Sequence, residues 1–277
     1  MRTVDFCLEG QEGRELWGTL SIPEKPLYSP VVMAHGALGF KDWAFFPWLA
    51  AFFAEEGFPV IRFNFSGSGM GPQTDGHFEN LEAFQADTIS KQVEDLRSVI
   101  QCVMAGKLGP DLPAQNTAFL WGHSRGGAVC LLAASRMPAV KAVATWATIA
   151  RVNRYLYEVK QAWRKQGFLA QESSRTGQLL KYSTDFLDDA EKWGREGDVP
   201  TYFHNLNIPA LLVHGSEDTS VPPEESESLA AVNPRTRLAI LAGANHKFNS
   251  SHPFAGPSAV LVEAAQRTVE FYQSAGR

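Results

Sequence analysis

The amino-acid sequence predicts an α/β fold: a doubly wound, mostly parallel sheet with an N-terminal antiparallel hairpin and a helical insertion. Short, continuous apolar runs, typical of strands covered on both faces, alternate with segments of helical periodicity. A strand, a helix and a further strand in that order indicate a parallel sheet. The 277 residues suffice for one large domain with a sizeable core.

The composition is that of an ordinary soluble globular protein, with 44% hydrophobic and 20% charged residues. A net charge of -5 disfavours nucleic acid and an anionic membrane as partners, because both require a basic face. The N-terminus lacks a signal-peptide pattern, and no apolar run reaches the roughly 18 residues of a membrane-spanning helix. The 3 cysteines lack metal-ligand spacing and are interpreted as free thiols. We expect a cytoplasmic monomer or homodimer.

The N-terminal elements follow the predicted fold in order. Residues 4–8 and 16–20 are β-like runs expected to pair as an antiparallel hairpin at the edge of the sheet. Residues 31–34 and 59–63 are buried strands, and 45–56 carries the helical period between them. This arrangement predicts the first parallel pair.

The loop 64–78 is rich in glycine and superficially resembles a phosphate cradle. A dinucleotide fingerprint that starts at Gly67 would need glycine where Pro72 stands, and no G-K-[ST] motif occurs anywhere in the chain. We interpret the loop as a flexible turn and expect no cofactor. A long amphipathic helix is predicted next, over 82–104.

The stretch 121–127 joins an apolar strand to a helix-like run at 128–136 and contains Ser124 between two glycines. It matches G-x-S-x-G, in which a tight turn strains the serine and holds its hydroxyl out at the end of the strand. We therefore predict that Ser124 is a nucleophile.

The second half of the chain is divided by a change of pattern. After a strand at 140–145, residues 147–206 become charged and aromatic and are predicted to form a helical cap insertion, while 1–146 and 207–277 form the core. The core pattern then resumes as strand, helix, strand and helix, at 209–215, 224–232, 236–241 and 257–273.

A serine nucleophile needs a histidine that removes its proton and a carboxylate that orients the histidine. Asp218 and His246 directly follow the last two predicted strands and are the favoured acid and base. Glu217 stays an alternative acid, although turns commonly seat a short carboxylate. His252 is the alternative base, but it lies deeper in its loop and is expected at the surface.

The remaining histidines show neither H-E-x-x-H spacing nor a cysteine partner, so no metal site is expected. His123 and His214 adjoin glycines at strand ends, where we expect them to bond to the backbone.

Acyl transfer also requires backbone N–H donors for the developing oxyanion. The amide of Arg125, directly after the nucleophile, is one candidate. The loop after the strand 31–34 offers the other, with Ala37 favoured over its neighbour Leu38.

These motifs resemble the α/β-hydrolase superfamily of serine hydrolases, over nearly the whole chain. The shared order is a nucleophile, an acid and a histidine, here Ser124, Asp218 and His246. The stretch Arg62-x-Asn64-x-x-Gly67-x-Gly69 makes the chain most similar to the cinnamoyl (feruloyl) esterase-like and serine aminopeptidase-like branch. The resemblance implies hydrolysis of a carboxylic ester through an acyl-enzyme.

Substrate choice in such folds belongs to the loops and cap over the strand ends. Aromatic side chains of the insertion either line an acyl or aryl pocket or pack the cap onto the core. The candidates for substrate binding are Leu38, Tyr155, Trp163 and Phe186. Basic residues of the insertion favour a solvated helix face over binding of an anionic substrate; they are Arg151, Arg154, Lys160, Arg164 and Lys165.

We therefore predict a serine esterase that acts on a small-molecule ester, aryl or short acyl, without a cofactor. A hydrolase of a thioester, amide or C–C bond is an alternative, as is a non-catalytic ligand-binding protein on the same fold.

Overall fold

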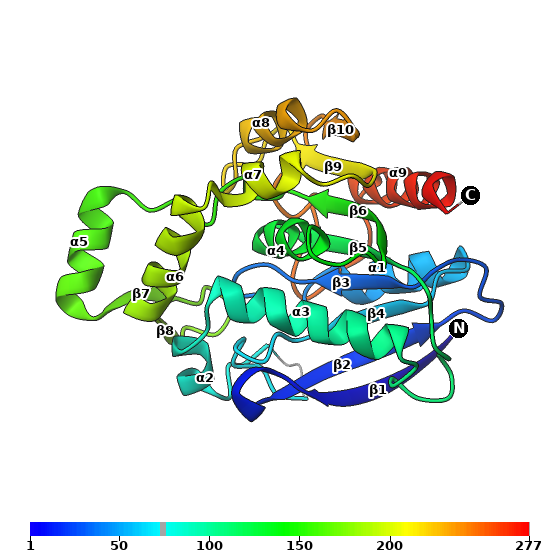
Figure 1. Ribbon diagram of the computed structural model, residues 1–277, viewed down its shortest axis with the longest axis horizontal. Helices are drawn as coiled ribbons and strands as arrows, with labels where there is room; N and C mark the ends of the chain where they lie inside the picture. The colour runs from blue at the N-terminus through cyan, green and yellow to red at the C-terminus, as the bar shows by residue number, and fades with distance from the viewer. Residues whose placement is uncertain (73–75, 277) are drawn as a thin grey trace.

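A computed structural model describes residues 1–72 and 76–276 of the chain. Its main sheet has eight strands in the order β1-β2-β4-β3-β5-β6-β9-β10 (Figure 1). Their bounds are β1 (Arg2–Glu9), β2 (Glu15–Ile22), β3 (Val31–Ala34), β4 (Val60–Phe63), β5 (Ala118–His123), β6 (Val140–Trp146), β9 (Ala210–Gly215) and β10 (Thr236–Leu241). The pairs from β4 to β10 are parallel, whereas β1 and β2 form an antiparallel hairpin that also joins β4 antiparallel. The predicted fold class is confirmed.

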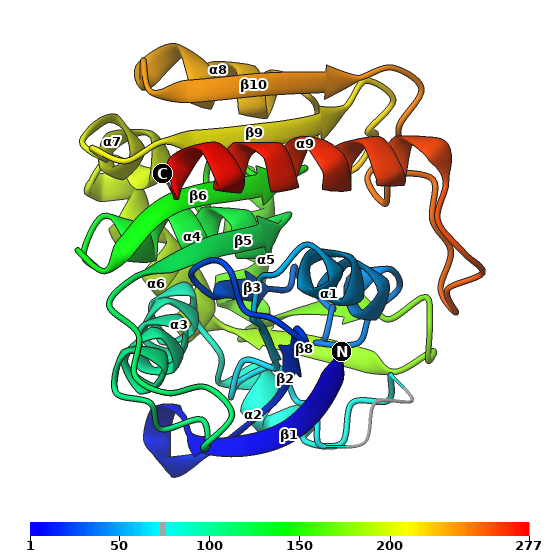
Figure 2. The same cartoon turned by 90° about the vertical axis from the view of Figure 1, so that its right-hand side faces the viewer.

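Helices cover both faces of this sheet, as Figures 1 and 2 show. They are α1 (Phe46–Glu55), α2 (Leu81–Gln85), α3 (Ile89–Met104), α4 (Arg125–Ala134), α8 (Glu224–Val232) and α9 (Ala259–Ala275). Val31 and Met33 of β3 pack in one buried cluster with α1 and α9, while Val32 and Ala34 pack in the other with α3 and α4. Side chains of a strand alternate between faces, so a continuous apolar run supplies both clusters.

The insertion at 147–206 is not wholly helical. It contains α5 (Tyr157–Gln166), β7 (Phe168–Glu172), β8 (Leu179–Ser183), α6 (Thr184–Arg195) and α7 (Asp198–His204), and the two strands form a separate antiparallel hairpin. The predicted helices are present as α5, α6 and α7, whereas the hairpin is not predicted, because β7 is largely exposed and only its first three residues are apolar. The insertion packs onto the core through the buried side chains of Trp163, Phe186 and Trp193, which join the cluster around α3 and α4. The division into a core and a cap at these boundaries stays a prediction.

The long helix predicted over 82–104 is two helices. Thr88 is extended (φ -147°, ψ 163°), and its hydroxyl accepts a hydrogen bond from the Lys91 amide, which caps the start of α3. Asn80 caps α2 in the same way, through the Ala83 amide. The break places the carboxylate of Asp87 inside the protein, where it is buried.

The glycine-rich turn, predicted to be flexible, is buried over residues 66–70. The amide and the hydroxyl of Ser66 each donate to Asp95 Oδ2 at 2.8 Å. A Cβ on Gly67 would lie 2.4 Å from Asp87 Oδ1, so only glycine fits against this carboxylate. The part of the loop at 73–75 lies outside the described residues.

Candidate active site

Ser124 occupies the turn between β5 and α4 with φ 56° and ψ -122°. A side chain in this region costs about 1–3 kcal/mol, and the surrounding packing has to enforce it. A Cβ on Gly122 would lie 2.4 Å from the Gly126 carbonyl oxygen, and one on Gly126 would lie 2.4 Å from the carbonyl oxygens of Ala34 and His35. The two glycines therefore permit the close approach of β3, β5 and α4 that holds Ser124 at the strand end.

Asp218 and His246 meet at the same edge of the sheet, because they follow the neighbouring parallel strands β9 and β10. His246 Nδ1 lies 2.7 Å from Asp218 Oδ2. The amides of Ser220 and Val221 each donate to Asp218 Oδ1 at 2.9 Å. Burial alone would raise the pKa of Asp218, but the hydrogen bonds from His214 and His246 outweigh it and hold the pKa below its usual value. Asp218 is thus an ionised acceptor.

The alternatives to this pair lie elsewhere. The side chain of Glu217 is exposed and makes no hydrogen bond or ion pair with any described residue. His252, expected at the surface, is partly buried, and its Nδ1 accepts a hydrogen bond from the Ala44 amide at 3.1 Å. His252 therefore helps to hold the 40–45 loop in place.

Two further histidines support the pair, and both bond to the backbone as predicted. His123 Nε2 lies 2.9 Å from the carbonyl oxygen of His246, and burial lowers the pKa of His123 to about 3, so the ring is neutral and donates from this nitrogen. His214 Nε2 lies 2.9 Å from the Val221 carbonyl oxygen and 3.2 Å from Asp218 Oδ2. The sequence predicts only a backbone bond for His214 and does not predict its contact with Asp218.

The candidate oxyanion donors lie on either side of Ser124. Arg125 is the first residue of α4, where the helix leaves its N–H groups without intrahelical acceptors. Ala37 is exposed in the loop after β3. Within the described residues, neither amide donates to a protein acceptor.

The Arg62-x-Asn64 motif holds the loop that carries Ala37. The Lys41 amide donates to Asn64 Oδ1 at 2.7 Å, and Arg62 donates to the Lys41 carbonyl oxygen at 3.1 Å and pairs with Asp42. His35 Nε2 also accepts from the Phe65 amide at 3.3 Å. The motif therefore positions the backbone next to the nucleophile.

Two small cavities adjoin Ser124, and both are also lined by Ala37. The first, of about 160 Å³, includes His246, Trp43 and Lys247. The second, of about 90 Å³, is named the arginine lobe and is lined by Ala37, Ile89, Ser124, Arg125, Ile149, Val152, Arg154, Tyr155 and Phe186. An acyl group and a leaving group could occupy the two sides of Ser124.

The substrate-binding candidates separate into two pairs. Tyr155 and Phe186 line the arginine lobe. Trp163 lines neither cavity at Ser124: it is fully buried, and its Nε1 donates to the Tyr182 carbonyl oxygen at 2.9 Å. Leu38 packs against the cluster around α3 and α4 and is likewise absent from both linings. Trp163 and Leu38 thus contribute to packing.

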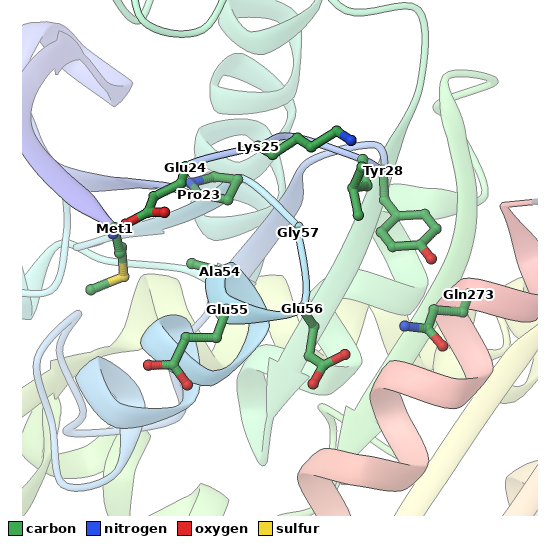
Figure 3. Close-up of a pocket in the computed structure, with 11 residues that line it drawn as sticks. Met1, Pro23, Glu24, Lys25, Tyr28, Ala54, Glu55, Glu56, Gly57 and Gln273 are labelled. Atoms are coloured by element: carbon green, nitrogen blue, oxygen red, sulfur yellow. Dashed lines mark ion pairs between the residues drawn. The ribbon is translucent and has the colours of Figure 1, made fainter.

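A larger cavity, of about 650 Å³, lies away from these residues, between the loop after β2 and the end of α1 (Figure 3). Its polar lining includes Glu55, Glu56 and Gln273, with no serine, cysteine or histidine. It adjoins Gly57, just before β4 begins, so it lies at the amino ends of the parallel strands. Active sites of such sheets form at the carboxyl ends, where Ser124 lies.

Among the described residues, no cluster of histidine, cysteine and acidic side chains is arranged to hold a metal ion. No helix in that part of the chain combines the length and apolarity needed to cross a membrane.

Comparison with solved structures gives matches along the whole chain. Est1E from Butyrivibrio proteoclasticus, also solved with ferulic acid bound, aligns with a TM-score of 0.68 at 19% identity over 98% of both chains. DcsB, in complex with a substrate analogue, gives 0.77 at 16% identity over 99% of both chains. A dienelactone hydrolase from Anabaena variabilis gives 0.64 at 16% identity over 100% of both chains. At these identities the likeness establishes the fold.

A comparison with curated protein sequences gives no match. A family model described as the alpha/beta hydrolase family matches residues 31–264, from the strand before Ala37 to the helix after His246. Because this match spans most of the chain and the sheet has the same fold as the solved hydrolases, the protein belongs to the α/β-hydrolase family.

Proposed function

We propose that this hydrolase is a serine esterase, which cleaves an aryl or short acyl carboxylic ester through an acyl-enzyme. The observation that carries the proposal is that a strained serine, the Ala37 amide and His246, held by Asp218, line one cavity, while the Arg125 amide directly follows the serine. Neither amide has a protein acceptor among the described residues. Each feature meets one requirement of acyl transfer: a nucleophile, a base held in one orientation, and donors for the oxyanion.

The reaction would proceed in two halves. Ser124 Oγ attacks the ester carbonyl carbon while His246 Nε2 takes the hydroxyl proton, and the Ala37 and Arg125 amides bind the developing oxyanion. The C–O bond to the alcohol then breaks, and His246 returns its proton to the leaving oxygen. Water attacks the acyl-enzyme by the same route, with His246 again as the base, and releases the acid.

His246 can act as the base because both its ring and its backbone are held by hydrogen bonds. Asp218 accepts from Nδ1, which leaves Nε2 as the basic nitrogen, and His123 fixes the backbone of His246 itself. The ionised Asp218 also stabilises the imidazolium that forms when Ser124 attacks.

The cavity volumes favour small substrates. The spaces of about 160 and 90 Å³ accommodate a phenyl ring or a short chain rather than a long fatty acyl chain. A solved neighbour described as an esterase domain, from Rhodothermus marinus, supports the choice of an ester bond, and the ferulic acid bound to Est1E supports an aryl acid as the acyl group.

The proposal is tested with p-nitrophenyl esters of increasing acyl length, together with a thioester and an anilide of the same acyl group. We expect kcat/KM to be highest for short esters and the Ser124→Ala variant to lose about 10⁴-fold or more. Faster turnover of the thioester or the anilide would reassign the bond, and no turnover of any substrate would favour a binding protein.

A further inference from the structure

The side chain of Arg125, unlike its amide, has no role in the proposed mechanism. Its guanidinium lies over the rings of Tyr182 and Phe186, with Cζ at 5.3 and 5.0 Å from the two centroids. Its one hydrogen bond among the described residues goes from Nη2 to the Tyr182 hydroxyl, at 3.3 Å. Arginine has five N–H donors, and this guanidinium has no carboxylate within ion-pair distance in the described part of the chain.

Cationic side chains line both cavities at Ser124. Arg125 and Arg154 line the arginine lobe, and Lys247 lines the adjoining cavity. No aspartate or glutamate belongs to either lining, although the chain as a whole carries a net charge of -5. A recess lined by positive charges, without acids in the lining, raises the local concentration of an anionic ligand.

The nearest acids balance Arg154 but form no ion pair with Arg125 among the described residues. Glu225 binds Arg154 at 3.0 Å and also accepts from the Ala150 amide at 2.6 Å, outside the lobe. Asp87 is within electrostatic range of Arg125 but forms no ion pair with it; its Oδ2 accepts from Gln92 Nε2 at 2.5 Å. Burial raises the pKa of Asp87 to about 7, which weakens it as a counterion at neutral pH.

We propose that the arginine lobe binds a carboxylate of the substrate, which makes the substrate a short ester with a second, ionised acid group. This inference rests on the proposed esterase function and specifies its substrate class, for example a monoester of a small dicarboxylic acid. The guanidinium offers a forked pair of donors to the carboxylate, and Tyr155, which also lines the lobe, adds a phenol. A lobe of about 90 Å³ has room for about three water molecules, so it holds an acid group on a short chain.

Binding is measured on the Ser124→Ala variant by titration calorimetry, so the result does not depend on turnover. The ligands are monomethyl glutarate and its neutral match, dimethyl glutarate, with 3-acetoxypropanoate to place the carboxylate on the alcohol side instead. We expect at least one of the two anions to bind about 10- to 100-fold more tightly than the diester. Equal affinities for all three ligands would overturn the proposal and leave the esterase assignment standing.

Charge variants identify the group responsible. Arg125→Met keeps an unbranched apolar side chain against Phe186 and should reduce the preference for the anion to about 2-fold or less, whereas Arg125→Lys should retain part of it. Arg154→Met changes an exposed side chain of the lobe and should reduce the preference severalfold. Arg151→Met removes an equal charge three residues away, outside the lobe, and is the matched control. An equal effect of Arg151→Met and Arg154→Met, or full preference in Arg125→Met, would contradict a built carboxylate site.

Discussion

Replacing Asp218 with asparagine tests how the histidine is held. Oδ1 accepts two backbone amides at 2.9 Å and Oδ2 accepts His246 Nδ1 at 2.7 Å. The side-chain oxygen of the introduced asparagine would keep the backbone bonds, which places its NH₂ group against His246 Nδ1. Two donors cannot share that contact, so His246 would carry its proton on Nε2, where the base is needed. We expect kcat to fall by about 10⁴-fold, equivalent to about 5.5 kcal/mol in the activation barrier.

The assay is steady-state hydrolysis of a short p-nitrophenyl ester, with thermal unfolding to show that the variant is folded. Glu217→Gln is the matched control, because it removes a neighbouring charge that contacts neither His214 nor His246. The kcat of this variant should stay within about 2-fold of the parent value. If Asp218→Asn kept more than a tenth of the activity, or Glu217→Gln lost as much, the orientation of His246 by Asp218 would be refuted.

Three further predictions concern the oxyanion loop, a buried acid and the turn at the nucleophile. Ala37→Pro removes one N–H donor and should lower kcat by about 10²- to 10³-fold with a smaller change in KM; an unchanged kcat in a folded variant would exclude the Ala37 amide as a donor. Asp87 has a pKa raised by burial from 3.8 to about 7, so the folded protein retains a proton that the unfolded chain loses, and stability falls as the pH rises through this window. Asp87→Asn should therefore stabilise the protein by up to about 4 kcal/mol at about pH 8 and by much less at about pH 4, as measured by urea unfolding; equal effects at both pH values would contradict this reading. Gly126→Ala places a Cβ 2.4 Å from two carbonyl oxygens and should lower the free energy of unfolding by about 3 kcal/mol or more. Gly167→Ala, at φ 83° with open space around it, should lower it by only about 1 kcal/mol. Similar unfolding midpoints for the two variants would count against the tight packing at the turn.

Strands and the order of elements could be predicted from the sequence because both faces of the sheet are covered. Continuous apolar runs such as 31–34 and 118–120 leave little ambiguity when helical periods separate them. The positions of Ser124, Asp218 and His246 follow from the same logic, since parallel strands bring their carboxyl ends to one edge. Their catalytic roles remain proposals.

Other features depend on contacts between distant segments. The break at 86–88 is marked only by Thr88 as a possible cap, and the burial of Asp87 beside Gly67 is a tertiary arrangement that periodicity does not encode. The hairpin of β7 and β8 is largely exposed on β7, so no apolar alternation marks it. In the same way, the position of Arg125 after the serine makes its amide a candidate oxyanion donor. The lobe around its side chain, in contrast, is built by Tyr155 and Phe186 of the insertion.

The central claim is that Ser124 is a nucleophile activated by His246. Its most direct test is reaction with a fluorophosphonate, followed by intact-mass and peptide mass spectrometry of the parent, Ser124→Ala and His246→Ala proteins. We expect one adduct per chain on Ser124 in the parent, none in Ser124→Ala, and a rate of modification reduced by about 10³-fold or more in His246→Ala. An unmodified parent protein, or an adduct that persists in Ser124→Ala, would contradict the claim.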